Sequence, residues 1–263
     1  MTEHGQEAGG GFARVDGAGQ WGPGASEETG PFALALQPVR AAGAARILFC
    51  EALLRQRGPD GHMAVPPALL SGSTSPAACA VWDCAVLERA FAHLRANPLA
   101  RLSVNVEPTT LEHGLWRQTC ARLGDGPWSR LIVELTERRL PLDPASLKPA
   151  LDALHSRGAA LAIDDFGAGR TALRHLIDWP VDMVKFDCRL CTVAARDAAR
   201  RAVLGGLVRM AGQLDLLTVA EGVEDADCAG CLTALGVDGL QGFHIGAPAL
   251  SDPAAPAALR RTG

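Results

Sequence analysis

Leu161-Ala162-Ile163-Asp164-Asp165 has the composition of a buried β-strand, yet it ends in two adjacent carboxylates. Strand interiors normally exclude charge, so an acid at the end of such a run indicates a function there. The pattern recurs along the chain, and like charges gathered at one place need cations. We therefore predict a divalent-metal site built by several strands of one barrel. The acids and the amide at these strand ends are Glu51, Asn105, Glu134, Asp164, Asp165 and Glu221.

Apolar strand-like runs alternate with helical patterns over most of the sequence, which is typical of an α/β domain with a largely parallel sheet. Eight such runs predict a closed barrel. About eight residues separate the first two strands, too few for a helical crossover, so this pair is expected to form a hairpin. Strands are expected at 32–37, 46–51, 101–106, 131–135, 160–164, 182–187, 217–221 and 238–243. Helices are expected at 77–95, 145–156, 197–214 and from an Asp225 cap to Leu235, with Gly236 as the stop.

Length and composition restrict the remaining possibilities. The 263 residues suffice for one barrel, which typically takes ~250 residues. A formal charge of -4, with scattered Lys and Arg, argues against binding a nucleic-acid duplex. No run approaches the ~20 apolar residues that span a bilayer, so a cytoplasmic protein without a membrane partner is expected. We expect a flexible glycine-rich leader at 1–30, a single barrel domain at 31–250 and a loose C-terminal tail at 251–263.

Two cysteine pairs, Cys188-x-x-Cys191 and Cys228-x-x-Cys231, allow two interpretations. The spacing within each pair is that of a structural zinc site. The 36 residues between the pairs exceed the ~15 to 20 of common zinc ribbons, and they contain an expected helix and strand. We therefore favour ordinary reduced thiols over zinc.

Short motifs containing the strand-end acids follow one another in a fixed order. They are Gln37-Pro38, Glu51-Ala52-Leu53-Leu54-Arg55, Ser103-Val104-Asn105, Glu134-Leu135-Thr136-Glu137, Asp164-Asp165-Phe166-Gly167-Ala168-Gly169, Lys185-Phe186-Asp187, Glu221-Gly222-Val223-Glu224 and Gln241-Gly242-Phe243. In this order they resemble the EAL domain family, the phosphodiesterases that hydrolyse cyclic di-GMP. The resemblance implies a modified (β/α)8 TIM-like barrel with one antiparallel strand. Taken singly, each motif has an ordinary structural explanation, such as an ion pair between Lys185 and Asp187.

The resemblance also implies a role for each matching residue. Two ions per active site, Mg²⁺ or Mn²⁺, would be held by Glu51, Asn105, Glu134 and Asp164 and by Asp164, Asp165 and Glu221. Lys185 would hold the attacking water, with Glu51 and Glu224 completing the catalytic set. The residues that would contact cyclic di-GMP are Gln37, Leu53, Arg55, Asp187 and Gln241, and Glu137 would anchor the loop after the paired aspartates.

That loop departs from the family pattern. Ala168 and Arg170 stand where the family usually has threonine and tyrosine, so activity could be reduced or differently regulated. The rival hypothesis is a catalytically weak or inactive receptor that binds cyclic di-GMP and signals through a protein partner. We favour the enzyme because no expected metal ligand is missing. The resemblance further suggests a homodimer, and control by a regulatory protein remains an open possibility.

Overall fold

The computed structural model describes residues 32–58, 61–66, 75–136, 140–141, 143–167 and 173–251. The expected leader, almost all of the expected tail, Glu137 and the loop residues Ala168 and Arg170 lie outside the described residues.

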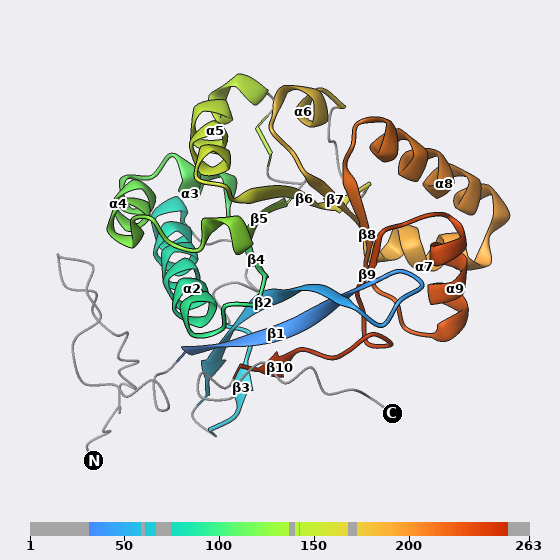
Figure 1. Cartoon of the computed structure of the whole chain (residues 1–263), viewed down its shortest axis with the longest axis horizontal. Coiled ribbons are helices and arrows are strands. Elements are labelled where there is room, and N and C mark those ends of the chain that lie inside the picture. The colour runs from blue at the N-terminus through green and yellow to red at the C-terminus, as the bar shows by residue number, and fades with distance from the viewer. Residues whose placement is uncertain are drawn as a thin grey trace, which may run out of the picture. The chain divides into compact units, whose positions relative to one another are not determined.

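Eight of the described strands close a barrel (Figure 1). Hydrogen bonding runs from β1 through β9, β8, β7, β6, β5, β4 and β2, and β2 pairs with β1 to complete the circle. Two short strands pair with barrel strands without belonging to the circle. β3 is antiparallel to β2, and β10 is antiparallel to β1. The strands are β1 (Phe32–Ala41), β2 (Ile47–Arg57), β3 (Met63–Ala64), β4 (Leu102–Asn105), β5 (Leu131–Thr136), β6 (Ala160–Phe166), β7 (Met183–Phe186), β8 (Leu217–Ala220), β9 (Gly239–Leu240) and β10 (Ala249–Leu250).

One barrel strand runs against the others. β1 is antiparallel to β2 and to β9, whereas the remaining neighbours in the barrel are parallel. A short turn joins β1 to β2, and Gly43 adopts a φ of +69° there, a conformation that glycine accepts readily. The predicted hairpin and the predicted barrel with one antiparallel strand are thus confirmed.

The predicted end of the second strand at Glu51 is wrong. β2 continues to Arg57 because its pairing with β1 continues as far as Phe32 opposite Gln56. Glu51 therefore lies in the middle of an antiparallel ladder, where its backbone position is fixed from both sides by Gln37 of β1 and Ser103 of β4.

Helices surround the barrel in Figure 1. The expected cap of the last one is confirmed: Asp225 accepts a hydrogen bond from the amide of Cys228 at 2.7 Å, and Gly236 follows the helix with a φ of +88°. The helix expected from residue 145 begins at Lys148, because Pro144–Ser146 form a separate 3-10 turn. The helices are α2 (Pro76–Ala96), α3 (Pro108–Leu111), α4 (Gly114–Leu123), α5 (Lys148–Ser156), α6 (Leu173–Asp178), α7 (Cys188–Arg196), α8 (Ala198–Gln213) and α9 (Ala226–Ala234), and the 3-10 turns are η1 (Trp128–Arg130) and η3 (Pro144–Ser146).

Two apolar clusters form the core. The larger one joins the strands to the surrounding helices. The smaller one is contributed only by barrel strands, and it fills the barrel interior as a layer of side chains. Its members are Val39, Phe49, Ile132, Ala162, Met183 and Val219. In the part of the chain that the structure describes, no helix has the length and apolar character needed to cross a bilayer.

Candidate active site

Several predicted site residues form a layer of polar side chains inside the barrel, next to the layer made by the smaller apolar cluster. Because side chains alternate along a strand, residues two positions apart point to the same side. Six of the polar site residues lie two positions from a member of the interior cluster. The pairs are Gln37 with Val39, Glu51 with Phe49, Glu134 with Ile132, Asp164 with Ala162, Lys185 with Met183 and Glu221 with Val219.

Lys185 stands at the centre of this layer with its side chain fully buried. Its Nζ lies 2.8 Å from Glu134 Oε2 and 2.8 Å from Glu221 Oε1. Asp164 Oδ1 follows at 3.1 Å and Glu51 Oε2 at 3.5 Å. Four acids, three on strands and Glu221 directly after β8, therefore converge on one cation, which leaves an excess of negative charge in a buried place.

The pKa values in this cluster reflect that excess. Burial raises the pKa of Glu134 and of Glu221 to about 8, and the other carboxylates add to the increase while Lys185 opposes it. Burial also favours a higher pKa for Glu51, but the charge of Lys185 and hydrogen bonds from Gln241 and Asn105 outweigh it, so the pKa of Glu51 is lowered. The cluster thus contains acids that a further cation would help to ionise.

Amide side chains fix the orientation of Glu51. Asn105 Nδ2 donates to Glu51 Oε1 at 2.6 Å, and Gln241 Nε2 donates to Glu51 Oε2 at 2.6 Å. Gln241 Nε2 also lies 3.2 Å from Gln37 Oε1, and Gln37 Nε2 donates to the carbonyl of Gly246 at 3.2 Å. Four residues from different parts of the chain therefore hold this carboxylate in one position, two directly and two through Gln241.

The paired aspartates occupy an irregular part of β6. The register between β6 and β7 shifts between Ile163 and Phe166, and Asp165 has a φ of +56°. A non-glycine residue in this conformation is uncommon, and bulges next to active sites often redirect a side chain. Here the irregularity falls at the two consecutive acids, of which Asp164 contacts Lys185.

The donor set fits a hard divalent cation. Glu134 Oε1 and Gln241 Oε1 are buried without a hydrogen-bond partner in the described part of the chain. All potential ligands are oxygens, which magnesium and manganese prefer. Within the described ranges, however, no three His, Cys, Asp or Glu side chains are arranged around a common ion position. The carboxylates converge on the ammonium group of Lys185 instead.

A cavity of about 440 Å³ opens beside the carboxylate cluster. Asn105 belongs to both, because it lines the cavity and donates to Glu51. Two residues expected to contact the substrate, Leu53 and Arg55, line it as well. The guanidinium of Arg55 donates one hydrogen bond to the carbonyl of Leu54 at 2.9 Å, which leaves other donors for a ligand.

Among the described hydrogen bonds and ion pairs, none joins Asp187 or Glu224 to Lys185. Asp187 is buried and caps α7, accepting hydrogen bonds from the amides of Arg189 at 2.8 Å and Leu190 at 3.3 Å. Glu224 is exposed, and it is not among the described acids that contact Lys185.

Asp83 is a cavity residue that the sequence did not single out. Its Oδ2 accepts hydrogen bonds from the amide of Glu107 at 2.9 Å and from Thr110 Oγ1 at 2.6 Å. Burial raises the pKa of Asp83 to about 7. The sequence feature that could have identified Asp83 is its place in an expected amphipathic helix, beside the apolar positions Val81 and Cys84.

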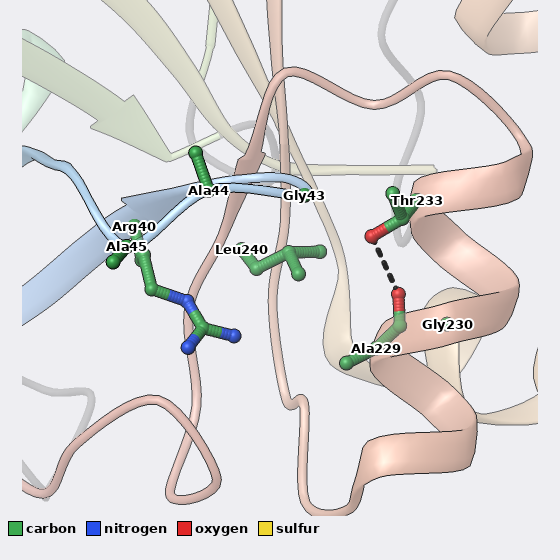
Figure 2. A pocket seen from close by; sticks show the side chains of 8 residues that line it. All are labelled: Arg40, Gly43, Ala44, Ala45, Ala229, Gly230, Thr233 and Leu240. Atoms are coloured by element: carbon green, nitrogen blue, oxygen red, sulfur yellow. Dashed lines mark hydrogen bonds between the residues drawn. The ribbon is translucent and has the colours of Figure 1, made fainter. Parts of the chain in front are cut away.

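A second cavity, of about 350 Å³, lies between the β1–β2 turn and α9 (Figure 2). Arg40 of β1 lines it together with small residues of the turn and of the helix, where Thr233 Oγ1 donates to the carbonyl of Ala229. None of the predicted site residues lines this cavity, so it is separate from the carboxylate cluster.

Sequence comparisons support one family. The family model described as EAL domain matches residues 25–248. Probable cyclic di-GMP phosphodiesterase PdeN of Escherichia coli (strain K12) is 30% identical over 227 residues, covering 82% of this chain and 43% of PdeN. Cyclic di-GMP phosphodiesterase PA2567 of Pseudomonas aeruginosa is 30% identical over 229 residues, covering 84% of this chain and 39% of the relative. The chain thus spans less than half the length of these curated relatives.

Solved structures resemble the fold closely. The PaMucR phosphodiesterase in complex with c-di-GMP has a TM-score of 0.75 and 28% sequence identity, covering 86% of this chain and 93% of that one. Klebsiella pneumoniae BlrP1 in its manganese/cy-diGMP complex has a TM-score of 0.70 and 28% identity, covering 84% and 57% of the two chains. BlrP1 has also been solved as a calcium/cy-diGMP complex.

Proposed function

Because this chain belongs to the EAL domain family, we propose that it is a metal-dependent phosphodiesterase that opens cyclic di-GMP to the linear dinucleotide. The observation that carries the proposal is the buried layer in which Glu51, Glu134, Asp164 and Glu221 surround Lys185. Its excess negative charge and its unsatisfied oxygens need cations, and the adjoining cavity offers room for a ligand. Hydrolysis would lower the concentration of a bacterial second messenger.

The proposed cofactors are two Mg²⁺ or Mn²⁺ ions per active site. One would be held by Glu51, Asn105, Glu134 and Asp164, and the other by Asp164, Asp165 and Glu221. Divalent ions there would supply positive charge to the phosphodiester and lower the pKa of the attacking water.

The residues of the chain have distinct tasks in this proposal. Lys185 opposes the negative charge that develops on the phosphate. Burial by itself would lower the pKa of Lys185, but the charges of the surrounding acids outweigh burial, raise the pKa well above its usual value and keep Lys185 protonated. Asn105 and Gln241 prevent Glu51 from rotating, so its oxygens keep one direction throughout the reaction. Arg55 grips a phosphate at the mouth of the cavity, since its planar fork offers several fixed donors.

Further contacts and partners belong to the same proposal. Gln37, Leu53, Asp187 and Gln241 complete the substrate site, and Glu224 assists catalysis from the segment after Glu221. Glu137 anchors the loop after the aspartates. The protein acts as a homodimer in the cytoplasm, where a regulatory protein controls it.

The test is incubation of the purified protein with cyclic di-GMP and either Mg²⁺ or Mn²⁺, with products separated by chromatography. We expect the linear dinucleotide, and we expect no product when a chelator replaces the metal. Binding of cyclic di-GMP, measured by calorimetry, with no hydrolysis under any metal would contradict the proposal and favour the receptor.

A further inference from the structure

The two cysteine pairs that the function leaves unused lie on two helices that pack against each other. Cys188 and Cys191 are on α7, and Cys228 and Cys231 are on α9. All four are present as thiols. The thiols of Cys188 and Cys228 both lie near enough to Cys191 to influence it electrostatically, so the fold gathers pairs that are distant in sequence.

The pair on α7 combines an exposed and a buried thiol three residues apart in one helix. Cys188 is the first residue of the helix and is exposed, whereas Cys191 is one turn further and fully buried. Residues three apart in an α-helix have Cα atoms ~5 Å apart, within the range that a disulfide spans. An exposed first cysteine and a buried second one allow an external disulfide to reach only Cys188.

Both sulfurs lie against residues in or next to the active-site layer. Cys191 Sγ donates to the carbonyl of Phe186 at 3.5 Å, and the backbone of Glu221 makes a hydrogen bond with the same thiol. Cys188 packs on Gly222, where an added Cβ would lie 2.2 Å from the sulfur. The dithiol thus lies next to the backbone of Glu221, an acid that contacts Lys185. In the sequence, Cys188 directly follows Asp187.

We propose that Cys188 and Cys191 form a redox-active pair whose oxidation to a disulfide changes the geometry of the active-site layer. The oxidant is a low-molecular-weight disulfide, RSSR. The Cys188 thiolate attacks one sulfur of RSSR, forming a mixed disulfide and releasing RS⁻. Cys191 then attacks Cys188 Sγ, its proton passes to solvent, and a second RS⁻ leaves. Two electrons pass from the two thiols to RSSR, which becomes two RSH.

The disulfide perturbs the site because the helix must adjust to form it. Cβ atoms three residues apart on a helix are ~5 to 6 Å apart, whereas a disulfide needs ~3.5 to 4.5 Å. In the reduced chain, Cys188 Sγ lies 3.9 Å from Thr192 Oγ1. Closing the pair therefore tightens the first turn of α7 and withdraws Cys191 from Phe186 and Glu221. The effect on turnover rests on the proposed function, but the formation of the disulfide does not.

The experiment treats the reduced full-length chain with glutathione disulfide, blocks remaining thiols by alkylation and digests with trypsin. Arg189 lies between the two cysteines, so cleavage after Lys185, Arg189 and Arg196 separates them. The expected product is the peptide of residues 186–189 joined to the peptide of residues 190–196 and released by dithiothreitol. Cys188→Ser should abolish this species, and the matched control Cys231→Ser, on α9, should retain it.

Turnover of cyclic di-GMP is measured on the same samples. We expect oxidation to lower it at least fivefold in the wild type and in Cys231→Ser, with recovery in dithiothreitol and no response in Cys188→Ser. If the reduced protein shows no hydrolysis, the proposed function fails, and the redox effect is then read from cyclic di-GMP affinity with calcium present.

Three outcomes would overturn the proposal. One is the absence of the joined peptides after oxidation of the wild type. Another is equal inhibition of Cys188→Ser, which would place the sensitive thiol elsewhere. The third is a zinc ion in the purified protein that is lost with Cys188→Ser, since the four thiols would then be a metal site.

Discussion

At the scale of single residues, Glu134 is the sharpest test of the site. Its side chain is fully buried, with Oε2 on Lys185 and Oε1 without a partner among the described residues. Glu134→Gln keeps the shape but removes the carboxylate that a bound cation would ionise, so we expect turnover to fall at least ~100-fold, or ~2.7 kcal/mol of barrier. Glu112→Gln makes the same change at an exposed position and should leave turnover unchanged. Steady-state kinetics and thermal melting distinguish lost catalysis from lost folding, and an unimpaired Glu134→Gln would refute the metal-ligand assignment.

Asp83 gives a prediction on pH. Its pKa is raised from 3.8 to about 7, chiefly by burial, so the folded state holds a proton that the unfolded state releases. The stabilisation from that proton is complete below pH 3.8 and is lost as the pH rises through about 7. Asp83→Asn imitates the protonated acid, because one oxygen accepts both hydrogen bonds in the structure.

Urea unfolding of wild type and Asp83→Asn between pH 5 and 8 measures this effect. The free energy of unfolding of the wild type should decline with rising pH more steeply than that of the variant, and the difference isolates Asp83 from the other buried acids. Asp152→Asn, at an exposed acid paired with Lys148, should keep the slope of the wild type. Parallel curves for wild type and Asp83→Asn would mean that Asp83 is ionised throughout.

At the scale of elements, the turn after β9 is more constrained than its sequence suggests. Gly242 has a φ of +154°, and an added Cβ would lie 2.3 Å from the backbone nitrogen and oxygen of Val223. Gly242→Ala must therefore displace either the segment after Glu221 or Gln241, which orients Glu51. We expect a lower melting temperature together with reduced turnover.

Gly230 of α9 is the matched control, because nothing lies within 4 Å of an added Cβ there. Gly230→Ala should increase the free energy of unfolding by about 0.5 to 1 kcal/mol, since it lowers the entropy cost of the helix. If Gly242→Ala were as stable as Gly230→Ala, the prediction would be wrong, because the turn could then accommodate a side chain without cost.

The sequence predicted most of the elements because their signals are local. Alternating apolar runs placed all eight barrel strands, and Asp225 with Gly236 placed the last helix. The end of the second strand at Glu51 was misplaced because its continuation depends on pairing with β1, which the run itself does not encode. Asp83 was missed for a similar reason: its partners Glu107 and Thr110 meet it only after the chain has folded.

At the scale of the whole molecule, the barrel turns scattered acids into one cluster. The register of neighbouring strands places Asn105 opposite Glu134 and Thr136 opposite Asp164. Since side chains two positions apart point to the same side, strands that contribute to the apolar layer also contribute to the polar layer next to it. The sequence could predict which residues belong to this layer. It could not predict that Lys185 would contact four of the acids, since that depends on the direction of side chains across the closed barrel.

Comparing divalent ions tests whether the carboxylate layer around Lys185 acts as one metal site. Magnesium and manganese accept short bonds and octahedral coordination, which suits a compact carboxylate cluster, whereas calcium prefers longer bonds and more ligands. We expect magnesium or manganese to support hydrolysis and calcium to support binding of cyclic di-GMP with turnover at least ~100-fold lower, or ~2.7 kcal/mol.

All three ions should raise the melting temperature of the wild type, since each relieves the crowding of buried acids and binds only the folded state. Glu134→Gln should lose most of that increase, and Glu112→Gln should keep it. Melting curves with each ion, and turnover measured at the same concentrations, check both parts. Equal turnover with calcium and magnesium would contradict the geometric requirement, because ions of such different size would not place an attacking water equally well. Melting temperatures that no ion changes would instead mean that Lys185 alone balances the acids.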